Sequence, residues 1–198
     1  MGSSREIDSV AAIWRSNGYS PVILKGSIAT RENFAAALRG NPAVVHVAAH
    51  VVFPPESSAA GLLALALQPE SGVELLSAAE IAAMRLQLGL VVLNGCSSAH
   101  APALPGAGLM GMTRAWLAAG ARAVIVTRWP TADQASGELF QTFYRRLALI
   151  YKDASLHTPP EQQSFAELLR DAQLAELQAG GQRASPANWA AYFSMERN

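Results

Sequence analysis

Three short apolar runs constrain the fold of this chain more than any other feature. They are residues 43–49 (AVVHVAA), 89–94 (GLVVLN) and 122–127 (RAVIVT), and each is continuous and rich in β-branched residues. Such runs are typical of strands buried on both faces of a parallel sheet. Segments with helical spacing separate them, which predicts right-handed crossover connections. We therefore expect an α/β fold with a mostly parallel central sheet and helices on both faces.

Apolar spacing and capping residues predict the remaining elements. Ser77 and Glu80 stand three residues apart, as in a capping box, and Gly120 is a natural helix stop. We expect further strands at residues 21–25, 62–67 and 189–195, and helices that begin after Thr30 and Ser77 or span about residues 106–119, 132–150 and 165–175. Residues 153–161, which are rich in helix breakers, are expected to form a loop.

Length and composition limit the classes of protein. The chain has 198 residues, of which 51% are hydrophobic, and this suits a single domain over residues 1–198. Its 15 basic and 15 acidic residues give a formal net charge of zero, so we expect no direct nucleic-acid partner. The absence of a long apolar run and of a signal peptide predicts no membrane partner. The single cysteine, Cys96, favours a reduced, cytoplasmic location.

Two of the predicted strands lead into reactive side chains. The run at residues 43–49 continues into His50, and the run at 89–94 continues into Gly95 and Cys96. In parallel sheets catalytic groups collect at the carboxyl ends of the strands. A thiol needs a neighbouring base to become a good nucleophile, and a histidine at the adjacent strand end supplies one. The competing interpretation is that Cys96 is an inert, small hydrophobic residue.

The other nucleophiles and bases are weaker candidates. His46 lies within its predicted strand and is expected to pack there as a structural residue. His100 is a second choice for a local base, and His157 is expected at the surface. Ser97 and Ser98 lack the G-x-S-x-G pattern of a serine nucleophile elbow.

No metal or cofactor is expected. The four histidines and one cysteine show no metal-ligand spacing. The glycine-rich GAGLMG at residues 106–111 opens a helix, but it has no P-loop lysine and does not directly follow a strand. We therefore do not interpret it as a phosphate site.

Seven stretches in one order resemble a known family, the CHAT-domain peptidases, which are caspase-like cysteine proteases related to separases. The resemblance runs from near Glu6 almost to the end of the chain. The stretches are KGSIATRENF (25–34), VVHVAAH (44–50), LVVLNGCSSA (90–99), GAGLMGMTRAWLAAGARAVIVTRWPTAD (106–133), FYRRL (143–147), LLRDAQLAEL (168–177) and PANWAAYF (186–193). The resemblance implies a caspase-like three-layer α/β/α fold.

The resemblance also implies roles for single residues. Cys96 resembles the family's nucleophile, and His50 resembles its general base. The backbone N–H groups of Cys96 and of the residue after His50 form the oxyanion hole in the caspase-like group, but that residue is usually glycine and here is Val51, which we expect to narrow the approach. TRWPTAD resembles a separase segment whose Asp lies beside the pocket for the residue before the cut. Asp133 is therefore the candidate for binding a basic substrate side chain, although an acidic residue also favours the first turn of a helix.

The function implied is cleavage of a protein substrate by a cysteine endopeptidase. The resemblance further implies control by a regulatory protein partner and a role in bacterial defence signalling. Two alternatives stay open: a caspase-like interaction module with weak or no catalysis, for which Val51 is the motive, and a different thiol acyltransferase or hydrolase.

Overall fold

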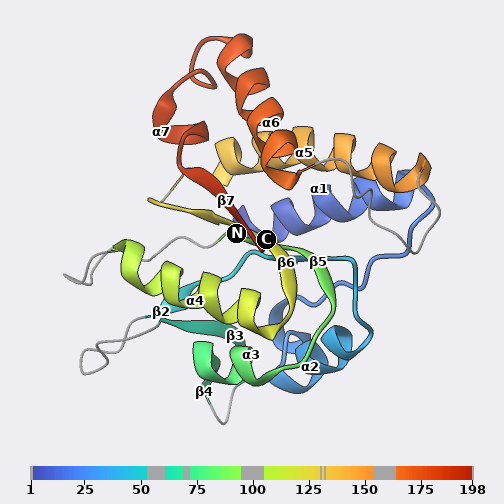
Figure 1. Cartoon of the computed structure of the whole chain (residues 1–198), viewed down its shortest axis with the longest axis vertical. Coiled ribbons are helices and arrows are strands. Elements are labelled where there is room, and N and C mark those ends of the chain that lie inside the picture. Colours follow the sequence, from blue (N-terminus) through green and yellow to red (C-terminus); the bar gives the residue numbers. More distant parts are fainter. Residues whose placement is uncertain are drawn as a thin grey trace. The chain divides into compact units, whose positions relative to one another are not determined.

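The computed structural model describes most of the chain (Figure 1). The described residues are 2–52, 61–68, 72–94, 105–129, 131, 133–153 and 164–197. They form two compact units. Unit 1 consists of Met1–Ile23 and Thr131–Ser194, and unit 2 consists of Leu24–Pro130 and Met195–Asn198.

The main sheet has four strands, in the order β1-β5-β6-β7. They are β1 (Val44–Val47), β5 (Leu88–Leu93), β6 (Ala121–Thr127) and β7 (Tyr192–Glu196). Strand β5 pairs in parallel with β1 on one side and with β6 on the other. All of β5 is buried, and so is β6 apart from the exposed Arg122. The predicted fold class, α/β with a mostly parallel sheet flanked by helices as in three-layer α/β/α proteins, is confirmed.

Strand β1 differs from the prediction in its burial. We expected it to be buried on both faces, but Val45 and Val47 are buried while Val44 and His46 are only half-buried. The reason is its place at the edge of the sheet, where it pairs with β5 alone in the strand order. The expectation that His46 belongs to the strand is confirmed.

A second, antiparallel sheet follows β1 in the chain. It contains β2 (Val51–Val52), β3 (Leu62–Gln68) and β4 (Gly72–Ser77), in the order β2-β3-β4. The strand predicted at residues 62–67 is confirmed as β3, but the sequence patterns did not reveal β4 or this separate sheet. Leu67 and Val73 are paired across β3 and β4 and are both exposed, so the strand pattern there lacks a continuous buried face.

The described part of unit 2 contains three α-helices that the sequence predicted and one short 3-10 helix that it did not. They are η1 (Gly26–Ile28), α2 (Arg31–Arg39), α3 (Ala78–Ala83) and α4 (Pro105–Ala119). Thr30 caps α2, because its side chain accepts a hydrogen bond from the Asn33 N–H at 3.1 Å. Helix α4 packs on α3 and on β6, and its Trp116 is fully buried.

Residues 21–25 do not form the predicted strand. They have neither helical nor strand structure, and Val22 is 75% exposed. An apolar run becomes a strand only where a neighbouring strand satisfies its backbone hydrogen bonds. None of the pairings within the described part of the chain includes this segment.

Helix α3 begins with the predicted capping box. The Ser77 Oγ accepts from the Glu80 N–H at 3.2 Å, and the Glu80 carboxylate accepts from the Ser77 N–H at 2.9 Å. Arg31 of α2 also donates to the Glu80 carboxylate. Hydrogen bonds from the Ser77 backbone, and then from the Ser77 and Arg31 side chains, lower the pKa of Glu80 to about 2.

We expect Glu80→Gln to lower stability near neutral pH by about 1 kcal/mol, which is typical of a lost helix cap at a partly exposed site. The folded-state pKa of Glu80 is depressed, so its stabilisation is present above about pH 4.5 and is lost as the pH falls toward 2. Urea unfolding of the parent chain and of Glu80→Gln at pH 7 and pH 3 would measure the free energy of unfolding of each. The difference in this free energy between the two proteins should be smaller at pH 3 than at pH 7. Glu32→Gln, in the exposed first turn of α2, is the matched control.

Unit 1 is helical and has an aromatic core. It contains α1 (Gly2–Ser16), α5 (Asp133–Asp153), α6 (Phe165–Ala179) and α7 (Pro186–Trp189). Helix α1 packs along α5, which also packs on α6 and α7. Phe140, Phe143 and Tyr144 are fully buried and contact each other through their rings. Burial, and then the charge of Glu6, raises the pKa of the Tyr144 hydroxyl.

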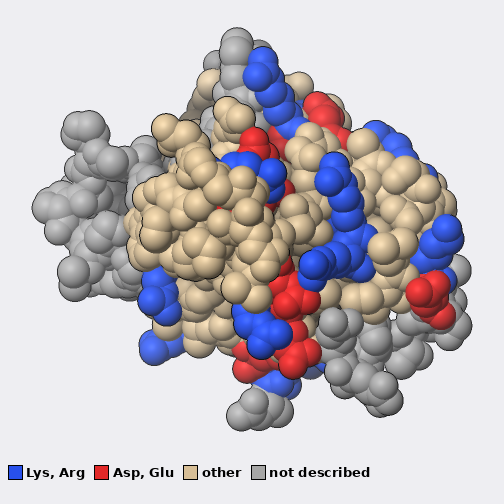
Figure 2. Space-filling view, turned by 90° about the horizontal axis from the view of Figure 1, so that it is seen from above, with Lys and Arg blue, Asp and Glu red and all other residues tan. Residues whose placement is uncertain are grey.

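The helices predicted at residues 132–150 and 165–175 are confirmed as α5 and α6. The strand predicted at residues 189–195 is confirmed only from Tyr192, where β7 begins, because Trp189 ends α7 and residues 190 and 191 form a turn. Most of the loop expected at residues 153–161 lies outside the described residues. Acidic and basic side chains are interspersed over the face shown in Figure 2. Across the described helices, none combines the length and the apolar character needed to cross a membrane.

Candidate active site

The carboxyl ends of three parallel strands meet at one edge of the main sheet. Val47 of β1 pairs with Leu93 of β5, and Leu93 pairs with Val126 of β6. Past the ladder, the Asn94 N–H donates to the Val47 carbonyl at 2.9 Å, which keeps the first two strand ends together. The carboxyl end of β5 therefore lies between the carboxyl ends of β1 and β6.

In the sequence, His50 and Cys96 follow this ladder after the same number of residues. His50 is three residues after Val47, and Cys96 is three residues after Leu93, the residue with which Val47 pairs. His50 is exposed, and its carbonyl accepts from the Ala64 N–H of β3 at 2.8 Å, so the second sheet fixes its backbone. Cys96, like Ser97, Ser98, His100 and His157, lies outside the described residues.

Val51 is built into strand β2 beside His50. It pairs with Leu63, and its side chain is only 5% exposed. Among the described residues the one non-glycine with positive φ is Asn41, so Val51 needs no left-handed conformation. Its side chain is buried and lines an apolar pocket, and the expectation that it narrows the approach to the site stays a prediction.

The pairing pattern also orients the backbone of Val51. The hydrogen bond between Ala64 and His50 makes these two residues the bonded pair of the β2–β3 ladder. In an antiparallel ladder the next pair, Val51 and Leu63, directs its N–H and C=O groups away from the partner strand. The Val51 N–H therefore points to the side of β2 opposite β3, and β2 is at the edge of its sheet. This amide is not used by the β2–β3 ladder.

A small apolar pocket lies beneath the carboxyl ends of β1 and β5. It is lined by Val47, Ala49, Val51, Leu63, Leu93, Met112 and Trp116. Ala49 and Val51 flank His50 in the chain, so the pocket supports the backbone on both sides of this residue. The Trp116 Nε1 is buried and makes no hydrogen bond within the part of the chain that the structure describes. Helix α4 thus gives the candidate site a rigid apolar wall.

Residues 128 and 129 follow β6 at the same edge of the sheet. The turn here is closed by the Thr127 hydroxyl, which donates to the Trp129 carbonyl at 2.5 Å. The Trp129 side chain is 38% exposed, although aromatic side chains are usually buried. We did not identify Trp129 as a candidate site residue from the sequence. Its position just after the buried parallel strand β6 is the sequence feature that could have identified it.

Asp133 is the first residue of α5, and its side chain is outside what the structure describes. Its contribution to a substrate pocket therefore stays a prediction. No group of three or more His, Cys, Asp or Glu side chains that suits a metal ion occurs among the described residues.

The sequence matches the family model of the CHAT domain over residues 1–197. This chain belongs to the CHAT domain family. The match runs through both units, and it confirms the relation to the caspase-like peptidases that the seven stretches indicated.

Two curated relatives of this CHAT domain are similar to parts of it. Tetratricopeptide repeat protein 28 of Mus musculus is 32% identical over 118 residues, which are 60% of this chain and 4% of that protein. Tetratricopeptide repeat protein 28 of Homo sapiens is 37% identical over 73 residues, which are 37% of this chain and 3% of that protein. The chain thus corresponds to a small fraction of the length of the curated relatives it matches.

Proposed function

We propose that this CHAT domain is a cysteine endopeptidase that cleaves a protein substrate with a Cys96–His50 dyad. The observation that supports the proposal is that the two residues follow paired ends of neighbouring parallel strands after the same number of residues in the sequence. A caspase-like family membership supports the same chemistry. We extend the proposal to control of cleavage by a protein partner, which the resemblance to CHAT-domain peptidases implies.

The proposed reaction has two steps. In the first, the Cys96 sulfur attacks the scissile carbonyl carbon while His50 accepts the thiol proton and then gives it to the leaving amine. The carbonyl oxygen becomes an oxyanion and accepts hydrogen bonds from the Val51 and Cys96 N–H groups. In the second step, water attacks the thioester with His50 as base, which releases the acid product and restores the thiol.

The orientation of Val51 supports its part in this reaction. Because its N–H points away from β3, it is directed to a side where it can donate to a bound group. Each such donor contributes roughly 3–4 kcal/mol to acyl transfer in well-studied proteases. Asp133 is included as the carboxylate that binds a basic side chain before the cut, since an Arg side chain pairs well with a carboxylate.

The rate of Cys96 alkylation by iodoacetamide, measured from pH 5 to pH 9, tests the dyad. A thiol paired with a histidine should react below pH 7, whereas an ordinary thiol reacts only near its pKa of about 8.5. We expect His50→Gln to move the reaction to the higher pH range. His46→Gln, which changes the half-buried histidine of the same segment, should leave the profile unchanged.

The same measurement decides the main alternative. If the parent chain reacts only near pH 8.5 with or without His50, the thiol is not activated. The domain would then be better interpreted as an interaction module that keeps the fold without the chemistry.

A further inference from the structure

Four exposed arginines lie at the amino-terminal edge of the main sheet, where the parallel strands begin. Arg39 ends α2 before β1, Arg85 stands between α3 and β5, Arg122 is the second residue of β6, and Arg197 follows β7. The Arg197 N–H donates to the Arg122 carbonyl at 2.8 Å, so the last two lie on adjacent strands. All four belong to unit 2, and we call them the arginine edge.

Hydrogen bonds between neighbouring segments fix the backbone of the arginine edge. The Gln87 N–H donates to the Asn41 Oδ1 at 3.1 Å, which joins the segment before β5 to the segment before β1. The Leu86 N–H donates to the Ala119 carbonyl at 2.7 Å, which joins the segment before β5 to the end of α4, just before β6. The strands follow the order β1-β5-β6-β7. Because adjacent strands lie about 4.8 Å apart, the four arginines follow one another in a row about 14 Å long.

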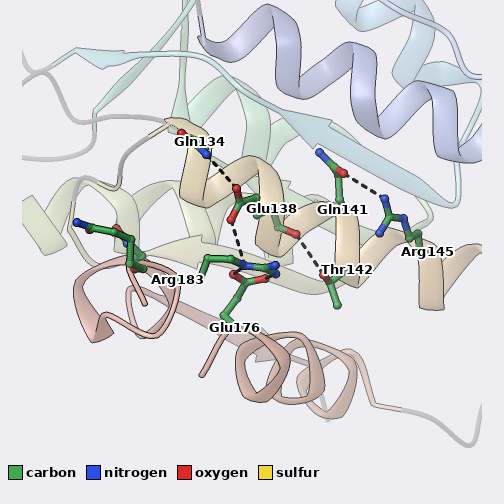
Figure 3. Close-up of polar contacts among 9 residues, drawn as sticks. Gln134, Glu138, Gln141, Thr142, Arg145, Glu176 and Arg183 are labelled. Atoms are coloured by element: carbon green, nitrogen blue, oxygen red, sulfur yellow. Dashed lines mark hydrogen bonds and ion pairs between the residues drawn. The ribbon is translucent and has the colours of Figure 1, made fainter. Parts of the chain in front are cut away.

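The guanidinium groups of the arginine edge have no acidic partner within the part of the chain that the structure describes. Two arginines of unit 1 show the contrast. Arg183 donates to the Glu176 carboxylate at 2.8 Å and pairs with Glu138 at 3.1 Å (Figure 3). Arg146 donates to the Asp171 carboxylate at 2.6 Å. Each guanidinium carries five N–H donors, so the groups of the arginine edge keep their donors for water or for a bound anion.

The segments that make up this edge are basic, although the chain as a whole carries no net charge. One acidic residue, Glu196, and the four arginines occur in these segments, which are residues 39–43, 84–88, 119–122 and 196–197. A cation in the last turn of a helix favours the helix dipole, which accounts for Arg39 at the end of α2. That effect does not account for Arg122, which lies in β6, or for Arg197, which follows β7.

The composition of this edge favours a carboxylate-rich ligand over a nucleic acid. A guanidinium group binds a carboxylate through two parallel hydrogen bonds. Single-stranded nucleic acids are usually held by aromatic side chains on which the bases stack, and the segments of this edge contain no Phe, Tyr or Trp. Domains that bind a duplex are usually strongly basic, whereas this chain has zero net charge. An extended peptide rises about 3.3 Å per residue, so about five residues would span the row of arginines.

We propose that the arginine edge binds an acidic, extended segment of a protein partner through pairs of carboxylate and guanidinium groups. The parallel strands β1, β5 and β6 run from this edge to the carboxyl edge of the sheet, which His50 follows. A partner bound here therefore occupies the opposite edge of the sheet from His50. The inference goes beyond the proposed function and does not depend on the chemistry of the Cys96–His50 dyad, so each can fail without the other.

Fluorescence anisotropy with two labelled peptides of equal length tests the proposal. One peptide alternates glutamate with serine, and the other alternates glutamine with serine. We expect the full chain to bind the glutamate peptide more tightly, and this binding to weaken as salt rises from about 50 mM to about 300 mM, because exposed charges are screened. Replacing each arginine of the arginine edge by glutamine should weaken binding about two- to five-fold, and replacing all four by about 20-fold or more. Because the four side chains are exposed, these variants should keep the parental Tm.

Arg145→Gln is the matched control. Arg145 is exposed on α5 in unit 1, and its guanidinium donates to the Gln141 side chain at 3.3 Å (Figure 3). The change removes the same charge from a different part of the chain and should leave the affinity for the glutamate peptide unchanged. Equal weakening by Arg145→Gln would show that net charge alone governs binding and would overturn the proposal. Failure of the glutamate peptide to bind, or tighter binding of an oligothymidylate with the same number of charges, would overturn it as well.

Discussion

Cys96→Ala is expected to lower the rate of cleavage of the protein substrate by at least about 10⁴-fold, the loss typical when a nucleophile is removed from a catalytic unit. The physical reason is that alanine has no lone pair with which to form the thioester. The fold should be retained, because the change removes one small side chain beyond the end of β5. The measurement compares protein termini generated by the parent chain and by Cys96→Ala in the same extract, followed by rates on a purified substrate.

Ser97→Ala is the matched control for this experiment. Ser97 is the next residue, and its hydroxyl is the nearest alternative nucleophile in the chain. Ser97→Ala should cleave the protein substrate at the parental rate. Cleavage by Cys96→Ala at the parental rate would show that the thioester mechanism is wrong. The residues found before the cuts test Asp133 as well: arginine and lysine support its role, and apolar or acidic residues count against it.

Gly120→Ala is expected to destabilise the protein by about 3 kcal/mol or more. Gly120 has φ +120°, which L side chains rarely adopt, and a Cβ there would lie 1.9 Å from the Leu86 carbonyl oxygen. Strained backbone costs about 1–3 kcal/mol, and overpacking against backbone adds a similar amount. Leu86 cannot move away easily, because its N–H donates to the Ala119 carbonyl at 2.7 Å.

Thermal unfolding measures this effect. For a chain of this size, 3 kcal/mol corresponds to a Tm lower by about 6–12 °C. The control is Gly137→Ala in α5, where an added Cβ meets no atom within 4 Å. That change should stabilise the protein by about 0.5–1 kcal/mol, since alanine favours a helix over glycine. Equal Tm values for the two variants would contradict the steric argument.

The parts of the fold that the sequence predicted are those in which one physical signal dominates. The runs that became β5 and β6 are apolar throughout because both faces of these strands are buried, and Thr30, Ser77 and Gly120 mark helix ends through local backbone chemistry. These signals need no knowledge of distant residues.

The remaining features depend on partners that are far apart in the sequence. Strand β4 has a weak pattern and is stabilised by its pairing with β3, while residues 21–25 have a strong apolar pattern but pair with no strand among the described residues. Val51 could be chosen as a candidate from its place after His50, but the direction of its N–H follows only from the β2–β3 register. The hydrogen bond between the Tyr192 and Thr131 hydroxyls could not be predicted from the sequence, because the two residues are 61 positions apart.

His50 and Cys96 each follow the paired ends of β1 and β5 by three residues, which has a consequence for insertions and deletions. Adding one residue between Val47 and His50 would move the imidazole by one step of about 3.3 Å relative to the end of β1 and turn it to the opposite side of an extended backbone. A compensating insertion between Leu93 and Cys96 would restore the equal numbers of residues that separate His50 and Cys96 from the paired strand ends. The lengths of these two short connections should therefore change together, or not at all, wherever the chemistry is kept.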